Sequence, residues 1–283
     1  MAMENERKVT KEEIKEYLEW MKIEGKSKNT RDKYRRDLNN LREFLNGRSL
    51  SKASVSEWKN DLQNHYAATS VNSMLAAANG FFKWLGLKEL EMGYLKIQRK
   101  LFCDQNKELE KSDYDKLVAA ARMLQKIRLM LLLETICGLG LRVSEVQYIT
   151  VEAARCGRAE IVMKGKVRTV MIAGKLAKKL LRYAGEQKIE TGEIFITRSG
   201  KSLSRSQIWR EMKSLCEVAG VEPAKVFPHN LRHLFARTYY NIYSDISKLA
   251  DVLGHSSVET TRIYLISSGE EHARQLEQLG LVS

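Results

Sequence analysis

The chain has 283 residues, more than a common single domain, and 43% of them are hydrophobic, so two folded domains are expected. Only two prolines and many Ala, Leu, Lys and Glu residues favour a mainly helical fold with little sheet. The formal net charge of +13 is shared by both halves of the chain and indicates a polyanionic partner, with nucleic acid ahead of an anionic membrane surface. A lysine-rich surface that is merely solvated would give the same net charge.

Membrane insertion, secretion and a disulfide framework are not expected. No window approaches 18 consecutive apolar residues, and the polar start MAMENERK lacks the apolar core of a signal peptide. The sequence therefore predicts a cytoplasmic protein without a membrane partner. The cysteines lack C-x-x-C spacing and are typical of reduced thiols rather than of a zinc site; they are Cys103, Cys137, Cys156 and Cys216.

Four helices are predicted in residues 1–88, which form one small domain. Apolar residues recur at helical spacing in each, and the second helix also has a basic side. A charged helix face is more often solvated than functional, so this domain alone indicates only possible DNA binding. The predicted helix starts are Thr10, Ser27, Ser54 and Ser70, of which Thr10 and Ser54 have a glutamate three residues later, as in a capping box.

Residues 89–107 are poorly periodic and are predicted to be a linker. A helix over 113–124, capped by Ser112, and an apolar helix ending at Gly138 and Gly140 should follow. The string GLGLRVSEV comes directly after that buried helix. An arginine at this place, Arg142, would ordinarily be a capping or surface group.

Two short β-type runs, AEIVM and VRTVMIA, flank Lys164-Gly165-Lys166 and predict a tight hairpin. Two lysines in such a turn would ordinarily be solvated. Further on, Ser204 and Gln207 form a capping box for a helix over 206–217 that could enter a DNA groove.

Residues 228–264 bring two histidines, an arginine and a tyrosine together at helical spacings. Pro228 suits the first position of a helix, and apolar residues at i, i+3 and i+4 should face the core. At about 100° per residue, His229 and Arg232 then share the opposite side, free to face a ligand. His229 and His233 are spaced as in a zinc helix, but Asn230 stands where the H-E-x-x-H motif needs glutamate, so no metal site is expected.

A further capping box, Ser256 to Glu259, predicts a helix that starts after His255 and carries Tyr264 about two turns in. On composition alone, Tyr264 has no stronger claim to a functional role than the nearby tyrosines, which are Tyr239, Tyr240 and Tyr243.

The strings PHNLRH and LGHSSVETTRIY, with nine residues from His255 to Tyr264, closely resemble the end of the tyrosine recombinase (phage integrase) family. The family pattern also contains an arginine in a G-L-R-x-S-E setting, matched at Arg142, and a lysine on a β-hairpin, matched at Lys164. The hairpin is one residue shorter than the frequent G-K-G-x-K-x-R form, which leaves Lys166 as a rival to Lys164.

The resemblance implies an N-terminal four-helix core-binding (SAM-like) domain and a mixed, mostly helical catalytic domain with a small hairpin. The expected divisions are 1–88, a linker over 89–107, and 108–283 with a C-terminal tail helix. It implies a site-specific recombinase of the simple, Xer-like kind without an arm-binding domain, acting through a 3′-phosphotyrosine, with no metal or other cofactor. The implied catalytic residues are Arg142, Lys164, His229, Arg232, His255 and Tyr264.

Arg142 and Arg232 would bind the phosphate, Tyr264 would attack it, and Lys164 would protonate the leaving oxygen. The implied partner is double-stranded DNA with an inverted-repeat site, bound by a homotetramer that the C-terminal tail connects. The resemblance allows two biological roles: integration or excision of a mobile element, and resolution of replicon dimers. Expected DNA contacts are Lys28, Arg31, Arg35, Arg36, Lys96, Arg99, Lys100, Arg198, Lys201, Arg205 and Arg210.

Three alternatives stand beside this interpretation. A type IB topoisomerase would use an equivalent set of residues, but the apolar tail and the close match of the motifs argue against it. A DNA-binding regulator that kept the fold without the chemistry should have lost one of the six positions, and all six are present. A membrane-surface protein would need a strongly amphipathic basic segment, which the sequence lacks.

Overall fold

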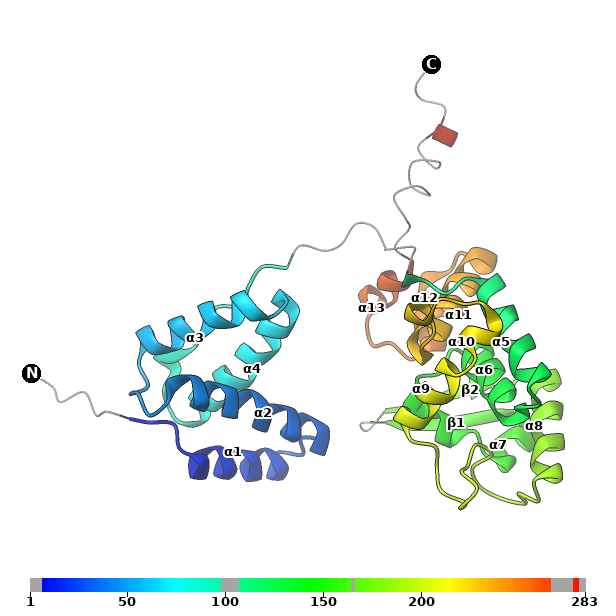
Figure 1. The fold of residues 1–283 in the computed structure, drawn as a ribbon, viewed down its shortest axis with the longest axis horizontal. Coiled ribbons are helices and arrows are strands. Elements are labelled where there is room, and N and C mark those ends of the chain that lie inside the picture. The colour runs from blue at the N-terminus through cyan, green and yellow to red at the C-terminus, as the bar shows by residue number, and fades with distance from the viewer. Residues whose placement is uncertain (1–6, 98–106, 164–165, 266–276, 280–283) are drawn as a thin grey trace, which may run out of the picture. The chain divides into compact units, whose positions relative to one another are not determined.

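The computed structural model describes residues 7–97, 107–163, 166–265 and 277–279 (Figure 1). The chain divides into two compact units, Met1–Arg99 and Lys100–Ser283. Both are mainly helical, and the regular strands of the described residues form one two-stranded sheet. This confirms the predicted fold class of a helical protein with a small hairpin.

The N-terminal unit contains the four predicted helices: α1 (Lys11–Ile23), α2 (Lys28–Leu45), α3 (Lys52–His65) and α4 (Ala68–Trp84). Their apolar faces meet in a core that includes the fully buried side chains of Trp58, Phe81 and Phe82. Burial of such large aromatic side chains is the main stabilising contribution in a domain of this size.

Two asparagines of α4 hold the chain that follows the helix. After the short 3₁₀ helix η1 (Lys88–Leu90), the backbone of Met92 exchanges two hydrogen bonds with Asn79, of 2.8 and 2.9 Å. Leu95 does the same with Asn72, at 2.7 and 2.9 Å. The first part of the predicted linker is therefore fastened along α4, because each amide replaces the backbone partner that a strand would supply.

The second unit is built around α6 (Ile127–Leu139), whose apolar residues are buried almost all round. Helices α5 (Lys111–Met123), α8 (Gly174–Glu186) and α11 (Pro228–Tyr243) contact α6. The 3₁₀ helix η3 (Val143–Tyr148) follows α6 after Gly140, which closes α6 in the left-handed conformation at φ 61°. Helix α7 (Val151–Cys156) comes next.

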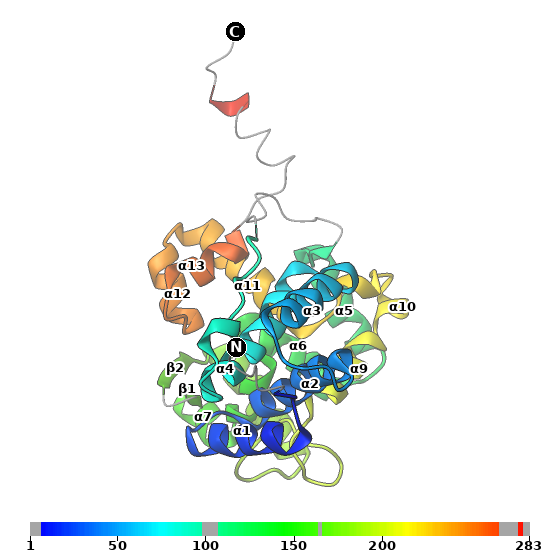
Figure 2. The ribbon, with the colours of Figure 1, turned by 90° about the vertical axis from the view of Figure 1, so that its left-hand side faces the viewer.

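The predicted hairpin is confirmed as β1 (Arg158–Met163) and β2 (Lys166–Met171), antiparallel, with Ile161 opposite Arg168. It contacts α7 and η3, and β1 and β2 lie next to α7 in both views (Figures 1 and 2). The remaining elements are α9 (Arg205–Lys213), α10 (Cys216–Ala219), η4 (Pro223–Lys225), α12 (Ile246–Leu253), α13 (Val258–Arg262) and η5 (Ile263–Leu265).

Several predicted helix boundaries were wrong. Helix α3 begins after Ser51 rather than Ser54, because Ser51 accepts the backbone N–H of Ser54 while the Ser54 hydroxyl accepts that of Ser51. Helices α4 and α5 likewise begin after Ala67 and Glu110, three and two residues before the predicted caps Ser70 and Ser112. The helix predicted over 206–217 ends at Lys213, and α10 is separate.

Candidate active site

Glu145 lies at the centre of the candidate site. Its side chain is 1% exposed. The residue lies in η3, which directly follows the buried helix α6. One carboxylate oxygen accepts the backbone N–H of Arg142 at 2.8 Å, and the other accepts Nη1 of Arg142 at 2.9 Å. This reciprocal contact fixes Arg142 at the end of α6, with its side chain still 39% exposed.

Two further arginines converge on the same carboxylate. Arg168 of β2 donates from Nη2 to Glu145 Oε2 at 2.6 Å, and Nη1 of Arg232 lies 3.8 Å from that oxygen. One carboxylate thus faces three guanidinium groups. The unbalanced positive charge makes this cluster a site for an anion, and planar guanidinium groups suit a phosphate in particular.

Arg232 is enclosed rather than open to solvent, unlike the sequence prediction that placed it on the free side of its helix. Its side chain is 1% exposed and donates to the carbonyl oxygens of Gly140 at 2.6 Å and Leu253 at 2.7 Å. Burial, followed by the charge of Arg142, lowers the pKa of Arg232 to about 10. Arg232 still carries its proton at neutral pH.

His255 lies in the turn between α12 and α13, as predicted, and both of its ring nitrogens have partners. Arg232 can only donate, so Nε2 of His255 accepts from Nη2 of Arg232 at 2.9 Å. The ring proton is then on Nδ1, which lies 2.8 Å from the Oγ1 of buried Thr261. Burial and the charges of Arg232, Arg142 and Arg168 lower the pKa of His255 to about 4, so the ring is neutral.

Tyr264 packs inside this cluster and is 7% exposed. Its ring stacks on His255 at a centroid distance of 5.6 Å and an interplanar angle of 9°. The rings of His233 and His229 lie 4.4 and 5.7 Å away. The predicted single helix carrying Tyr264 is wrong: Ser257, not Ser256, caps the short α13, and Tyr264 lies in the 3₁₀ turn η5.

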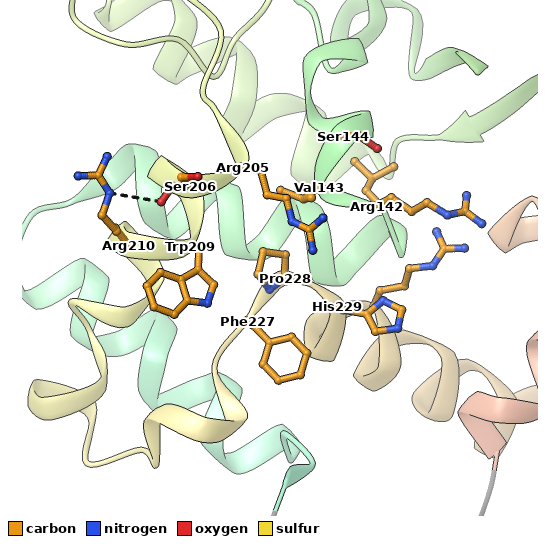
Figure 3. A pocket seen from close by; sticks show the side chains of 12 residues that line it. Arg142, Val143, Ser144, Arg205, Ser206, Trp209, Arg210, Phe227, Pro228 and His229 are labelled. Atoms are coloured by element: carbon orange, nitrogen blue, oxygen red, sulfur yellow. Dashed lines mark hydrogen bonds between the residues drawn. The ribbon is translucent and has the colours of Figure 1, made fainter. Parts of the chain in front are cut away.

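A pocket of about 710 Å³ opens beside these residues (Figure 3). Arg142, His229 and Arg232 line it on one side. Burial, with the charges of Arg232, Arg142 and Arg205, lowers the pKa of His229, so this ring too can accept a proton. The opposite wall belongs to α9 and includes Arg205, Ser206, Trp209 and Arg210.

The predicted residues are only partly gathered at this site. Arg142, His229, Arg232, His255 and Tyr264 lie together, and Arg205 and Arg210 line the same pocket. Lys164, Arg99 and Lys100 lie outside the described residues, as does most of the predicted tail helix. Arg31 is partly buried, and the remaining predicted DNA contacts are exposed: Lys28, Arg35, Arg36, Lys96, Arg198 and Lys201.

Three residues of the site were not singled out from the sequence: Arg168, Thr261 and Trp209. His233 was considered only as a metal ligand. A signal existed for Arg168, because the frequent family form of the hairpin ends in arginine. Thr261 carried none, since a threonine in a helix is an ordinary residue. Burial and the charge of His229 lower the pKa of His233 to about 4.

Neither a metal cluster nor a membrane span is found in the part of the chain that the structure describes. No three His, Cys, Asp or Glu side chains among those residues are grouped to hold a metal ion. None of the described helices is both long and apolar enough to cross a bilayer.

Gly254 leaves space for the side chain of Arg168, and its replacement by alanine should destabilise the chain. Gly254 ends α12 at φ 65°, and an added Cβ would lie 2.3 Å from Cδ of Arg168. We expect Gly254→Ala to lower the free energy of unfolding by about 2–4 kcal/mol, from backbone strain and the clash together. The matched control is Gly220→Ala, at φ 60° with no atom within 4 Å. Equal urea midpoints for the two variants would contradict the prediction that a methyl group at Gly254 clashes with Arg168.

The neutral histidines predict acid sensitivity. The pKa values of His233 and His255 are about 4 in the folded chain, against 6.5 for an ordinary histidine. At pH values between 4 and 6.5 the unfolded chain binds more protons than the folded chain. The free energy of unfolding should therefore decrease as the pH falls from 6.5 to 4. Thermal unfolding between pH 7 and 4.5 measures this, and His255→Gln should have a shallower pH dependence. If His255→Gln kept the pH dependence of the wild-type chain, His255 would not be a source of the acid sensitivity.

Comparison with known proteins agrees with this geometry. Residues 107–271 match the phage integrase family, and residues 14–89 match the phage integrase N-terminal SAM-like domain. Tyrosine recombinase XerA of Pyrococcus furiosus is 28% identical over 287 residues, covering 98% of this chain and 97% of the relative. Tyrosine recombinase XerD of Rhizobium meliloti is 30% identical over 279 residues, with 89% of each chain covered.

A solved structure also shares the fold. The lambda integrase tetramer bound to a Holliday junction matches 92% of this chain and 78% of its own, at 15% identity and a TM-score of 0.73. The phage integrase family model spans residues 107–271, which is more than half of the chain. The chain therefore belongs to the phage integrase family and is a site-specific tyrosine recombinase.

Proposed function

We propose that this chain binds double-stranded DNA at a specific site and cuts and rejoins its strands through a covalent 3′-phosphotyrosine, with Tyr264 as the nucleophile. The observation that carries this proposal is the position of Tyr264, whose ring contacts three histidines beside Arg232, which is buried. A nucleophilic hydroxyl beside fixed positive charge is what attack on a phosphodiester needs.

Arg142 and Arg232 would bind the two non-bridging oxygens of the scissile phosphate. Glu145 holds Arg142 through two hydrogen bonds and lies near Arg232, so both guanidinium groups are oriented before DNA arrives. Such preorganisation stabilises the charge that develops on the phosphate oxygens in the transition state. Arg232 at present donates to two carbonyl oxygens, and a phosphate would compete with them as a stronger, charged acceptor.

In the cleavage step the Tyr264 oxygen forms a bond to phosphorus, and the bond from phosphorus to the 5′ oxygen breaks. Neutral His229 is suited to accept the phenolic proton, because burial and nearby arginines lower its pKa. Lys164 is proposed to give a proton to the departing 5′ oxygen. The reverse step joins a 5′ hydroxyl to the phosphotyrosine and releases Tyr264, so no nucleotide cofactor is needed.

His255 is proposed to assist the same phosphate. In the described conformation its two nitrogens are engaged by Arg232 and Thr261. A phosphate that draws Arg232 away from His255 would free Nε2, and its negative charge would raise the pKa of the ring. Protonated at that nitrogen, His255 could then donate to a phosphate oxygen.

DNA contacts outside the catalytic centre are proposed on both units. The N-terminal unit, proposed to be a core-binding domain over 1–88, presents Lys28, Arg35 and Arg36 on α2. Residues 89–107 would cross the DNA backbone as a linker, and α9 of the catalytic domain, 108–283, offers Arg205 and Arg210. Arginine and lysine supply most phosphate and base contacts in protein–DNA complexes.

Strand exchange between two sites requires four active sites, so we propose a homotetramer on an inverted-repeat site, connected by the C-terminal tail. The lambda integrase structure, a tetramer on a Holliday junction, supports that assembly by analogy. The biological role would be integration or excision of a mobile element, or resolution of replicon dimers, in the cytoplasm.

The function can be tested with a duplex that the protein itself selects. The full chain is used to select a bound site from randomised duplexes, and that site is rebuilt with a nick beside the cleavage position so that the short strand diffuses away. We expect a covalent protein–DNA adduct on a denaturing gel in the presence of EDTA, with peptide mass spectrometry assigning it to Tyr264. Specific binding without any adduct would instead favour the regulator without chemistry.

A further inference from the structure

The segment that carries Tyr264 turns few side chains toward the rest of the second unit. From Ser256 to Tyr264, the structure buries Thr261, at 0% exposure, and Tyr264, at 7%, and leaves the other residues exposed. These two residues are three positions apart, so they lie on one face where α13 continues into η5. The position of the proposed nucleophile relative to the arginines therefore depends on what Thr261 and Tyr264 contact.

Thr261 meets the arginine cluster through His255. The Oγ1 of Thr261 lies 2.8 Å from Nδ1 of His255, and Nε2 of the same ring lies 2.9 Å from Nη2 of Arg232. Because a guanidinium group only donates, Nε2 has to accept, and the proton of the neutral ring is on Nδ1. The hydroxyl of Thr261 is therefore the acceptor of that Nδ1–H group, and this hydrogen bond decides which nitrogen of His255 is protonated.

The same hydrogen bond sets the plane of the imidazole ring. The ring of His255 stacks on that of Tyr264 at a centroid distance of 5.6 Å and an interplanar angle of 9°. A rotation of the imidazole would break this stacking and would move Nε2 away from Arg232. A buried hydroxyl costs free energy unless it is hydrogen-bonded, and His255 supplies the partner of Thr261. One hydroxyl thus connects the segment of Tyr264 to the phosphate-binding arginines.

We infer that Thr261 is a positioning residue for cleavage: its hydroxyl holds His255 with an unprotonated Nε2 directed at the phosphate site, and so holds the ring on which Tyr264 stacks. This inference rests on the proposed function. Thr261 does not touch DNA in this role, because its side chain is fully buried. When a phosphate displaces Arg232 from His255, Nε2 can take up a proton from solvent while Nδ1–H keeps its acceptor, so both nitrogens of the charged ring are hydrogen-bonded.

The first measurement is the tautomer of His255 in the full chain without DNA. Long-range ¹H–¹⁵N correlation spectra of histidine-labelled protein at neutral pH distinguish a protonated ring nitrogen from an unprotonated one, and His255→Gln identifies the signals of His255. In the wild-type chain we expect the proton on Nδ1. In Thr261→Val the Nδ1–H group has no acceptor, so we expect the Nδ1-protonated form to lose its dominance.

The second measurement is the single-turnover rate of adduct formation on the nicked duplex. We expect Thr261→Val to lower this rate by about ten- to a hundredfold, because small displacements of reacting groups have costs of that order. DNA affinity, measured by gel shift, should be unchanged. Thr261→Ser keeps the hydroxyl and should restore the tautomer, and the rate to within about threefold of wild type. Thr260→Val is the matched control, since Thr260 is the exposed neighbour on the same helix, and it should behave as wild type.

A wild-type His255 protonated on Nε2 would overturn the inference, and this result needs no variant to fold. An unchanged tautomer or an unchanged rate in Thr261→Val would overturn it too. So would a Thr261→Ser variant as slow as Thr261→Val, because the methyl group rather than the hydroxyl would then matter. If the wild-type chain formed no adduct although His255 was protonated on Nδ1, the result would count against the proposed function itself.

Discussion

Tyr264→Phe should abolish the covalent adduct while leaving DNA binding intact. The substitution removes one oxygen from a side chain that is 7% exposed, and the ring can keep its contacts with His255 and His233. Tyr239 and Tyr240 pack against the same small core as Tyr264, but among the described tyrosines the ring pairs with His229, His233 and His255 are those of Tyr264. Loss of a nucleophile that works as a unit with its neighbours should lower the rate of adduct formation by more than about 10⁴-fold.

The measurement is adduct formation on the self-selected nicked duplex, with a gel shift on the intact duplex to report affinity. Tyr243→Phe is the matched control, because Tyr243 lies on α11 and is largely exposed. It should form the adduct at the wild-type rate. An adduct of normal yield with Tyr264→Phe would mean that another residue attacks, and the assignment of Tyr264 would then be wrong.

Local pattern was sufficient to predict the order of the main helices and the hairpin. Apolar residues at helical spacing correctly marked α1, α2 and α6, and two short β-type runs around a glycine correctly marked β1 and β2. Helix starts were less predictable where serines compete. Ser51 and Ser54 are both good caps, and the structure begins the helix after Ser51, where the two serines form a reciprocal capping box.

The grouping of the site depended on long-range contacts that periodicity does not contain. Arg232 was expected on a free helix face, but the ends of α6 and α12 bring the carbonyl oxygens of Gly140 and Leu253 to it. Helical spacing can place a side chain on one side of a helix, and it says nothing about what covers that side. The motif strings predict the catalytic residues by resemblance and include Glu145 as a supporting residue; the structure adds that three arginines share its buried carboxylate.

Glu145→Gln should strongly destabilise the second unit. The amide has nearly the shape of the carboxylate but no charge, so Arg168 and Arg232 would remain largely buried without their shared anion. Breaking a buried ion pair from one side typically costs about 3–5 kcal/mol, because the remaining charge is left uncompensated. We expect a loss of that size in the free energy of unfolding, measured by urea titration with circular dichroism.

Glu211→Gln provides the matched control, since Glu211 pairs with Arg128 at 2.7 Å but its side chain is 30% exposed. Solvent screens that pair, so its loss should cost no more than about 1 kcal/mol. Inorganic phosphate should stabilise Glu145→Gln more than wild type, because an anion can occupy the cluster in place of the lost charge. Equal losses for the two variants, with no extra response to phosphate, would show that the three arginines do not depend on Glu145, and the preorganisation argued for the phosphate site would fail with it.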